Sequence, residues 1–147
     1  MSAREAFVDT NVLVYAVAAD HPDKQKVARG IVERGFTKGC YAISCQVLLE
    51  LYVTLTRKVL KPLDQDEALR FTTALTAWDI VETTTDLVLA ACVLARRHGL
   101  SVWDAAILEA ARAAGCDQVL SEDLTHGGRY AGITVRNPFA PTPRSGR

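Results

Sequence analysis

The sequence predicts an α/β fold with three layers, in which a central parallel sheet of about five strands is flanked by helices. Short runs rich in β-branched or aromatic residues alternate along the chain with longer segments of helical periodicity, as is typical of parallel sheets covered on both faces. The chain has 147 residues, of which 49% are hydrophobic. This length is enough for one domain with its own core and too short for two.

Five runs are the expected strands, each near the usual length of about five residues or slightly shorter. They are residues 6–8, 41–44, 79–82, 118–120 and 133–136.

Helices are expected between these strands, because capping and helix-breaking residues bound the segments. Pro22 suits a first helical turn and Gly35 suits the end of the same helix, while Asp64 and Glu67 have the spacing of a capping box. The expected helical segments are one that follows Asn11, then 22–35, 45–58, 64–77, 84–98 and 102–114, the last two ended by Gly99 and Gly115. We expect one domain over residues 1–139 and a disordered tail over 140–147.

Composition limits the classes of partner and location. The 17 Lys and Arg residues balance the 17 Asp and Glu residues, so a nucleic acid would have to be held by a local basic patch. The four cysteines form no C-x-x-C pair and have no histidines at zinc-finger spacing, which favours buried free thiols and a reducing cytoplasm. Neither a signal peptide nor an apolar run of the ~20 residues that a membrane span needs is present in this sequence. We therefore expect a cytoplasmic protein with no membrane partner.

Asp9 closes the first expected strand and is followed by Thr10 and Asn11. In open parallel sheets the functional crevice lies beyond the carboxyl ends of the strands, so the Asp9 carboxylate is expected there. Thr10 and Asn11 are close enough to orient it or a bound water. The alternative is that Asp9 or Asn11 simply caps the next helix.

Glu50 is the only acidic residue between positions 33 and 64, and it lies in an otherwise apolar helical segment. Such an acid is a candidate functional residue. The alternative is an ordinary solvated row of polar residues on one helical face, consisting of Gln46, Glu50, Thr54 and Arg57.

Ser101 and Asp104 have the spacing of a capping box before an apolar run. In this motif Ser101 caps the helix, and the Asp104 carboxylate reaches back to a backbone amide. A helix N-terminus also favours anionic groups and phosphates, so capping and metal binding by Asp104 are compatible.

The expected strand 118–120 runs into Ser121, Glu122 and Asp123. This segment could be a plain turn. Asp9 and Asp123 nevertheless occupy equivalent places at the ends of two separate strands.

Four acids that converge at one end of a sheet would repel one another and raise one another's pKa unless a cation neutralised them. Oxygen ligands without His or Cys favour Mg²⁺ or Mn²⁺, which typically join an acidic cluster to substrate phosphates. The set Asp9, Glu50, Asp104 and Asp123 therefore points to metal-dependent phosphodiester chemistry with one ion, or with two ions ~4 Å apart.

Five segments carry a resemblance to a known family. They are FVDTNVLVY, ISCQVLLELY, LSVWDAAILEAA, VLSEDL and ITVRNPF. In this order they resemble PIN-domain proteins, particularly the VapC-type toxins of bacterial toxin–antitoxin pairs, over about residues 7–139. The resemblance implies an α/β fold with a parallel sheet, metal-dependent ribonuclease activity on RNA, an antitoxin partner and a homodimer. It assigns catalytic and metal-binding roles to Asp9, Glu50, Asp104 and Asp123, and supporting roles to Asn11 and Ser121. Whether Glu122 or Asp123 faces the metal stays open.

The alternative function is a PIN-like module that binds RNA or protein without cutting it. No phosphate-binding loop of the type G-x-x-x-x-G-K-[ST] or G-x-G-x-x-G is present in the sequence. The three histidines lie outside the acidic motifs and are expected to be surface residues; they are His21, His98 and His126. Candidates for contacts with an RNA backbone are Arg57, Lys58, Lys61, Arg96, Arg97 and the arginines of 127–147, although each is also explained as a solvated charge.

Overall fold

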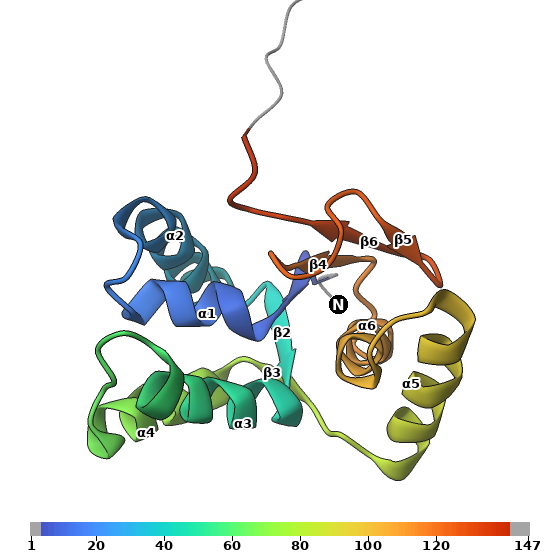
Figure 1. The fold of residues 1–147 in the computed structure, drawn as a ribbon, viewed down its shortest axis with the longest axis horizontal. Helices are drawn as coiled ribbons and strands as arrows, with labels where there is room; N and C mark the ends of the chain where they lie inside the picture. Colours follow the sequence, from blue (N-terminus) through green and yellow to red (C-terminus); the bar gives the residue numbers. More distant parts are fainter. Residues whose placement is uncertain (1–3, 142–147) are drawn as a thin grey trace, which may run out of the picture.

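A sheet of five parallel strands and one short antiparallel strand lies at the centre of the protein (Figure 1). The structure is a computed structural model and describes residues 4–141. The strand order is β3-β2-β1-β4-β6-β5. The strands are β1 Ala6–Val8, β2 Tyr41–Ser44, β3 Asp79–Val81, β4 Gln118–Leu120, β5 Arg129–Tyr130 and β6 Ile133–Arg136. The predicted fold class is confirmed, and all five expected strands are present, with β3 one residue shorter.

The strand β5 was not predicted. It has two residues and pairs with β6 through a tight turn in which Ala131 and Gly132 have positive φ angles of 52° and 83°. Such two-residue turns match the twist of antiparallel strands, but their usual sequences have Asn, Asp or Gly at the first position. Ala131 lacks that signal, and the run is too short for a period of two to be recognised.

The strand order reverses between β1 and β4. From β1 the chain adds β2 and then β3 on one side, whereas β4 and β6 lie on the other side. In the register of β1 and β4, Val8 is opposite Leu120, and the Asp9 amide donates to the Leu120 carbonyl at 2.9 Å. The segments that follow β1 and β4 therefore start side by side, at the point of the sheet where ligands are usually bound.

Helices cover both sides of the sheet. In Figure 1, α1 to α4 lie on the left, and α5 and α6 lie at the lower right, below β5 and β6. Helix α6 contacts β1, β2, β4 and β6, and α5 packs against α6. The helices are α1 Thr10–Val17, α2 Pro22–Lys38, α3 Cys45–Val53, α4 Gln65–Ala74, α5 Thr85–His98 and α6 Val102–Ala113; a π-helical turn, Thr54–Lys58, continues α3, and a 3₁₀ turn, Leu75–Ala77, continues α4.

The core forms where these layers meet. Every residue of β1 and β2 is buried, as expected for parallel strands covered on both faces. Helix α6 adds a stripe of small and branched residues, including Ala105, Ile107 and Leu108, that are almost fully inaccessible to solvent. This packing holds the carboxyl ends of β1 and β4 in one place.

The predicted end of the second helix at Gly35 was wrong. Helix α2 continues to Lys38 and ends at Gly39, whose φ of 62° suits a glycine after a helix. Gly35 is buried, and a Cβ at this position would clash with the indole ring of Trp78. The glycine is therefore explained by close packing against Trp78 rather than by helix termination.

Three further predictions from the sequence concern the burial of the cysteines, membrane-spanning helices and the C-terminal tail. All four cysteines are free, but only Cys40 and Cys116 are buried, and Cys92 is exposed on α5. None of the helices within residues 4–141 combines the length and the apolar character needed to cross a membrane. Most of the expected disordered tail, residues 142–147, lies outside the described residues.

Candidate active site

Asp9 is both a helix cap and part of a polar cluster. Its carboxylate accepts hydrogen bonds from the Thr10 amide at 2.7 Å, the Ser121 hydroxyl at 2.8 Å and the Asn11 side-chain amide at 3.4 Å. The residue is only 5% exposed. Burial raises the pKa of Asp9 to about 6, and the nearby carboxylates of Asp123 and Glu50 add to this rise. Asp9 therefore caps α1 and also belongs to the polar cluster, so the two roles considered from the sequence do not exclude each other.

Asn11 connects the ends of β1 and β4. Its Nδ2 lies 3.1 Å from an Asp123 carboxylate oxygen and 3.3 Å from the Ser121 hydroxyl, in addition to its contact with Asp9. Its Oδ1 accepts a hydrogen bond from the Glu122 amide at 3.1 Å. The Asn11 side chain thus contacts two carboxylates that are 114 positions apart in the sequence. The aspartates that follow β1 and β4 lie close together, in agreement with the prediction.

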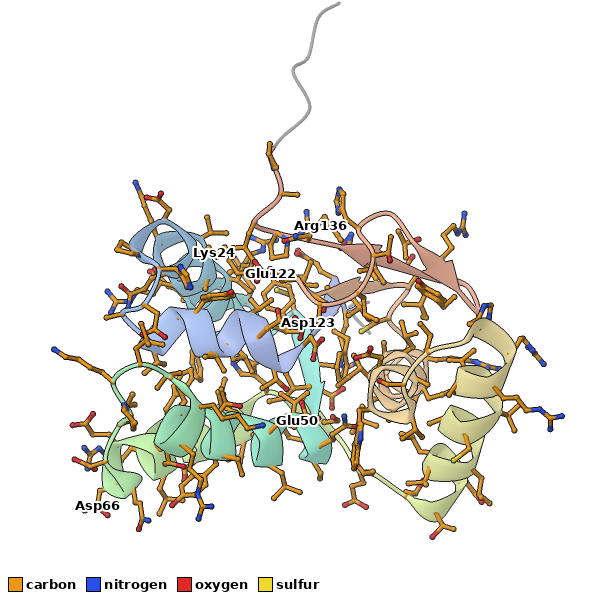
Figure 2. All side chains as sticks on the ribbon, viewed as in Figure 1. Lys24, Glu50, Asp66, Glu122, Asp123 and Arg136 are labelled. Atoms are coloured by element: carbon orange, nitrogen blue, oxygen red, sulfur yellow. The ribbon has the colours of Figure 1, made fainter. Side chains whose placement is uncertain are left out.

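Glu122 and Asp123 point to different surroundings. The Tyr15 hydroxyl donates to Glu122 at 2.6 Å, and the Lys24 ammonium lies 2.6 Å from its other oxygen. Partial burial raises the pKa of Glu122, but these two hydrogen bonds outweigh that effect, and the net pKa is lowered. Figure 2 shows Glu122 beside Lys24, whereas Asp123 lies nearer the centre of the molecule. Asp123 is therefore the acid of this pair that faces the crevice.

Glu50 faces inward from α3. The Thr10 hydroxyl donates to one of its oxygens at 2.9 Å, and the Gln46 side-chain amide donates to the other at 2.7 Å. Gln46 is buried, and it also donates to the backbone carbonyl of Trp103 at 3.2 Å. The alternative of a solvated polar row is therefore wrong for Gln46, which is buried. Glu50 is half-buried and accepts hydrogen bonds from two other side chains.

Sequence reasoning missed the role of Gln46. Its signal was its position one helical turn before Glu50, where a side-chain amide can bind a carboxylate on the same helical face.

Asp104 lies in the first turn of α6, and its backbone amide donates to the Ser101 hydroxyl at 3.1 Å. Within residues 4–141, no backbone amide donates to the Asp104 carboxylate, so the reciprocal half of the predicted capping box is absent. Partial burial raises the pKa of Asp104, and the charges of Asp123 and Glu50 raise it further. The carboxylate therefore senses the same cluster of acids.

A cleft of about 320 Å³ opens beyond these residues. Glu50 and Asp123 both line it, and Figure 2 shows Asp123 above Glu50 near the middle of the molecule. His21 also lines the cleft, although the sequence placed it outside the site. The full lining is Thr10, Asn11, Val14, Tyr15, Asp20, His21, Glu50, Thr54, Lys58, Val59 and Asp123. Asp9, which is buried, and Asp104 are not among the lining residues.

The donor atoms around the crevice suit a hard divalent cation. They are carboxylate, hydroxyl and amide oxygens, the ligands that Mg²⁺ and Mn²⁺ prefer. Within the described part of the chain, no three His, Cys, Asp or Glu side chains lie close enough together to hold a metal ion by themselves. The raised pKa of Asp9 reflects a buried carboxylate beside other acids, which a bound cation would stabilise in its ionised form. The four acids remain predicted ligands.

The family profile described as the PIN domain matches residues 6–126. The chain belongs to the PIN-domain family. The matched region starts at the first residue of β1 and extends beyond Asp123. It therefore includes the ends of β1 and β4 and all four acids of this PIN domain.

Solved structures share the fold of this PIN domain. A toxin–antitoxin complex from Klebsiella pneumoniae aligns with a TM-score of 0.65 and 20% identity, over 92% of this chain and 98% of the other. The sarcin–ricin-loop-cleaving toxin VapC20 of Mycobacterium tuberculosis aligns with a TM-score of 0.62 and 21% identity, over 81% and 90%. DNA-bound VapBC from Salmonella typhimurium aligns with a TM-score of 0.66 and 17% identity, over 92% and 98%. A comparison with curated proteins finds no significant match.

Proposed function

We propose that this PIN domain is a metal-dependent endoribonuclease that hydrolyses phosphodiester bonds of RNA. The observation that carries the proposal is the contact set of Asn11 and Thr10. Asn11 joins Asp9 to Asp123, and Thr10 joins the same helix N-terminus to Glu50. Hydrogen bonds thereby link three acids from separate elements at the point where the strand order reverses. A cluster of this kind is suited to binding cations and, through them, phosphates.

The four acids have complementary roles in this proposal. Asp9 and Asp123 would hold the ion from the ends of β1 and β4, while Glu50 and Asp104 would complete its oxygen ligands. When bound, Mg²⁺ or Mn²⁺ would neutralise charge on the phosphate and make a water easier to deprotonate. Asn11, Thr10 and Ser121 orient the carboxylates through the hydrogen bonds described above, because misplaced ligands weaken both metal binding and activity.

The biological role that we propose is that of the toxin in a toxin–antitoxin pair. Among its structural neighbours are a toxin–antitoxin complex and a toxin described as cleaving the sarcin–ricin loop. The corresponding partners of this chain are an RNA substrate, a cognate antitoxin and a second copy of the chain, within the cytoplasm. The domain that carries this function is proposed to extend over residues 1–139.

The test is cleavage of RNA by purified protein with Mg²⁺ or Mn²⁺, by wild type and by Asp9→Asn. The substitution is expected to lower kcat/KM by more than the roughly 10–100-fold typical of a residue that only supports a ligand. Asp66→Asn is the matched control, because Asp66 is an exposed acid on α4, far from the crevice in Figure 2.

Two results would count against the proposal. Cleavage that is unchanged by EDTA would exclude the acid-cluster mechanism. Binding of RNA without cleavage, under all metal conditions, would favour the non-cutting module instead.

A further inference from the structure

A second hollow adjoins the acidic crevice. It has a volume of about 360 Å³ and is lined by Leu49, Glu50, Val53, Thr54, Lys58 and Trp103. Glu50, Thr54 and Lys58 also line the crevice itself. A chain molecule that occupies the crevice can therefore extend into this hollow without leaving the surface of the protein.

Lys58 lines both the crevice and this hollow. It is the last residue of the π-helical turn that continues α3, and its side chain is exposed. None of the ion pairs found within residues 4–141 includes Lys58. The Leu60 amide donates to the Asp20 carboxylate at 3.2 Å, so the segment after Lys58 is tied to the loop between α1 and α2. The backbone is thus fixed before Lys58 by the π-helical turn and after Lys58 by the hydrogen bond of the Leu60 amide.

Trp103 presents a large aromatic surface on the other side of the same hollow. It is 67% exposed. Its backbone carbonyl is held by Gln46, the same residue that holds Glu50. The backbone of Trp103 is therefore fixed relative to Glu50, and Trp103 immediately precedes Asp104.

We propose that Lys58 and Trp103 form a subsite for the nucleotide that adjoins the scissile bond of single-stranded RNA. The Lys58 ammonium binds the backbone phosphate of that nucleotide, and the Trp103 indole stacks on its base. This inference rests on the proposed ribonuclease function.

Two features support an RNA strand as the occupant. An acidic crevice repels a polyanion, so a cation next to it is needed to hold the neighbouring phosphate. A basic group combined with an exposed aromatic ring is the usual arrangement for binding single strands. An apolar protein partner would make use of Leu49 and Trp103, but it would leave the Lys58 charge of the same hollow without a counterpart.

The first measurement is equilibrium binding of a fluorescein-labelled single-stranded oligoribonucleotide of mixed sequence. It is made in an Asp9→Asn background to prevent cleavage, over a series of salt concentrations. Adding Lys58→Ala is expected to weaken binding and to reduce the slope of log K against log salt by about 0.7, the value for one phosphate contact on a single strand. Lys58→Arg is expected to restore both quantities. The control is Lys61→Ala, which removes an exposed charge three positions away that lines neither space.

The second measurement concerns Trp103. Trp103→Ala is expected to weaken RNA binding roughly tenfold with little change in the salt slope, whereas Trp103→Phe retains most of the affinity, because any aromatic ring can stack on a base. In the protein with intact acids, Lys58→Ala and Trp103→Ala are each expected to raise KM more than they lower kcat. Loss of a residue with only a structural role would not raise KM selectively in this way.

The outcomes separate the subsite from the proposed function. If the wild type does not cleave RNA but its binding still depends on Lys58 and Trp103, the ribonuclease proposal fails and the subsite stands. If the wild type cleaves RNA and these variants keep wild-type KM and salt dependence, the subsite is wrong. A change of oligomeric state in Trp103→Ala by sedimentation, with unaltered RNA affinity, would identify the hollow as a protein contact and would also overturn the inference.

Discussion

Glu122 and Asp123 are adjacent acids whose side chains have opposite electrostatic surroundings. Glu122 is paired with the Lys24 ammonium and accepts a hydrogen bond from Tyr15, so its charge is already compensated. Asp123 is exposed, and its carboxylate accepts a hydrogen bond from the Asn11 side-chain amide. A cation entering the crevice therefore gains more from Asp123 than from Glu122.

This difference predicts separate effects of two substitutions. Asp123→Asn is expected to remove most of the rise in Tm that Mn²⁺ causes in the wild type, because a ligand charge is lost. Glu122→Gln is expected to keep that rise and to lower the free energy of unfolding without metal by about 1 kcal/mol, through its weakened contacts with Lys24 and Tyr15. Thermal melting with and without Mn²⁺ measures both effects. The reverse pattern would make Glu122 the ligand.

At the scale of single elements, the start of α6 shows how a capping motif can be shared between folding and function. Ser101 caps the helix through the Asp104 backbone amide, while the Asp104 carboxylate is not used for capping within the described residues. The motif thus stabilises the helix through Ser101 and leaves the Asp104 charge near the crevice.

Substitutions at these two positions are accordingly expected to separate stability from metal binding. Ser101→Ala should lower the free energy of unfolding by about 1 kcal/mol, the usual effect of losing a cap. Asp104→Asn should change the metal-free value by less than about 0.5 kcal/mol, because attraction to the helix dipole opposes repulsion by the other acids. It should also reduce the shift caused by Mn²⁺. Urea unfolding of both variants is the measurement, and a loss of about 1 kcal/mol in Asp104→Asn would restore its capping role.

Helix α2 offers a matched pair of glycines. Gly35 lies against the Trp78 indole, whereas nothing lies within 4 Å of a Cβ placed at the exposed Gly30. Gly30→Ala is expected to stabilise the protein by up to about 1 kcal/mol, since alanine favours the helix. Gly35→Ala is expected to destabilise it by about 1–3 kcal/mol through overpacking. Equal effects of the two substitutions in urea unfolding would show that helix propensity alone matters at both positions.

At the scale of the whole molecule, the acid cluster links folding to pH. The pKa of Asp9 is about 6 in the folded protein, against an ordinary value of 3.8, mainly because of burial. The folded state therefore keeps a proton that the unfolded chain releases over this range. Without metal, the free energy of unfolding is expected to fall as pH rises from about 4 to about 6, by at most about 3 kcal/mol. Because metal binding needs the ionised carboxylate, the stabilisation by Mn²⁺ should be larger at about pH 7 than at about pH 5.

Asp9→Asn is the variant that tests this linkage. Asparagine caps a helix about as well as aspartate but carries no charge. The metal-free variant is therefore expected to be at least as stable as the wild type at about pH 7 and to lose the decrease between about pH 4 and 6. Its shift on adding Mn²⁺ should be smaller. Melting curves of both proteins at the two pH values provide the comparison, and identical shifts would remove Asp9 from the proposed ligands.

The sequence alone was enough to locate the parallel strands and the acids at their ends. Strand identity follows from short apolar runs and from alternation with helices, and both are local properties of the chain. The convergence of Asp9 and Asp123 followed from one general rule, that the carboxyl ends of parallel strands lie at the same edge of a sheet. Their contacts with Asn11 agree with that expectation.

The tertiary structure decided which neighbour each polar or small side chain meets. It showed Glu122 paired with Lys24, Gln46 buried against Glu50, and Gly35 packed on Trp78. In two of these cases the partner comes from a distant segment, and in the third the burial of the helical face depends on other helices. Local propensity and periodicity carry no information about such contacts, because they arise only when the layers pack around the sheet.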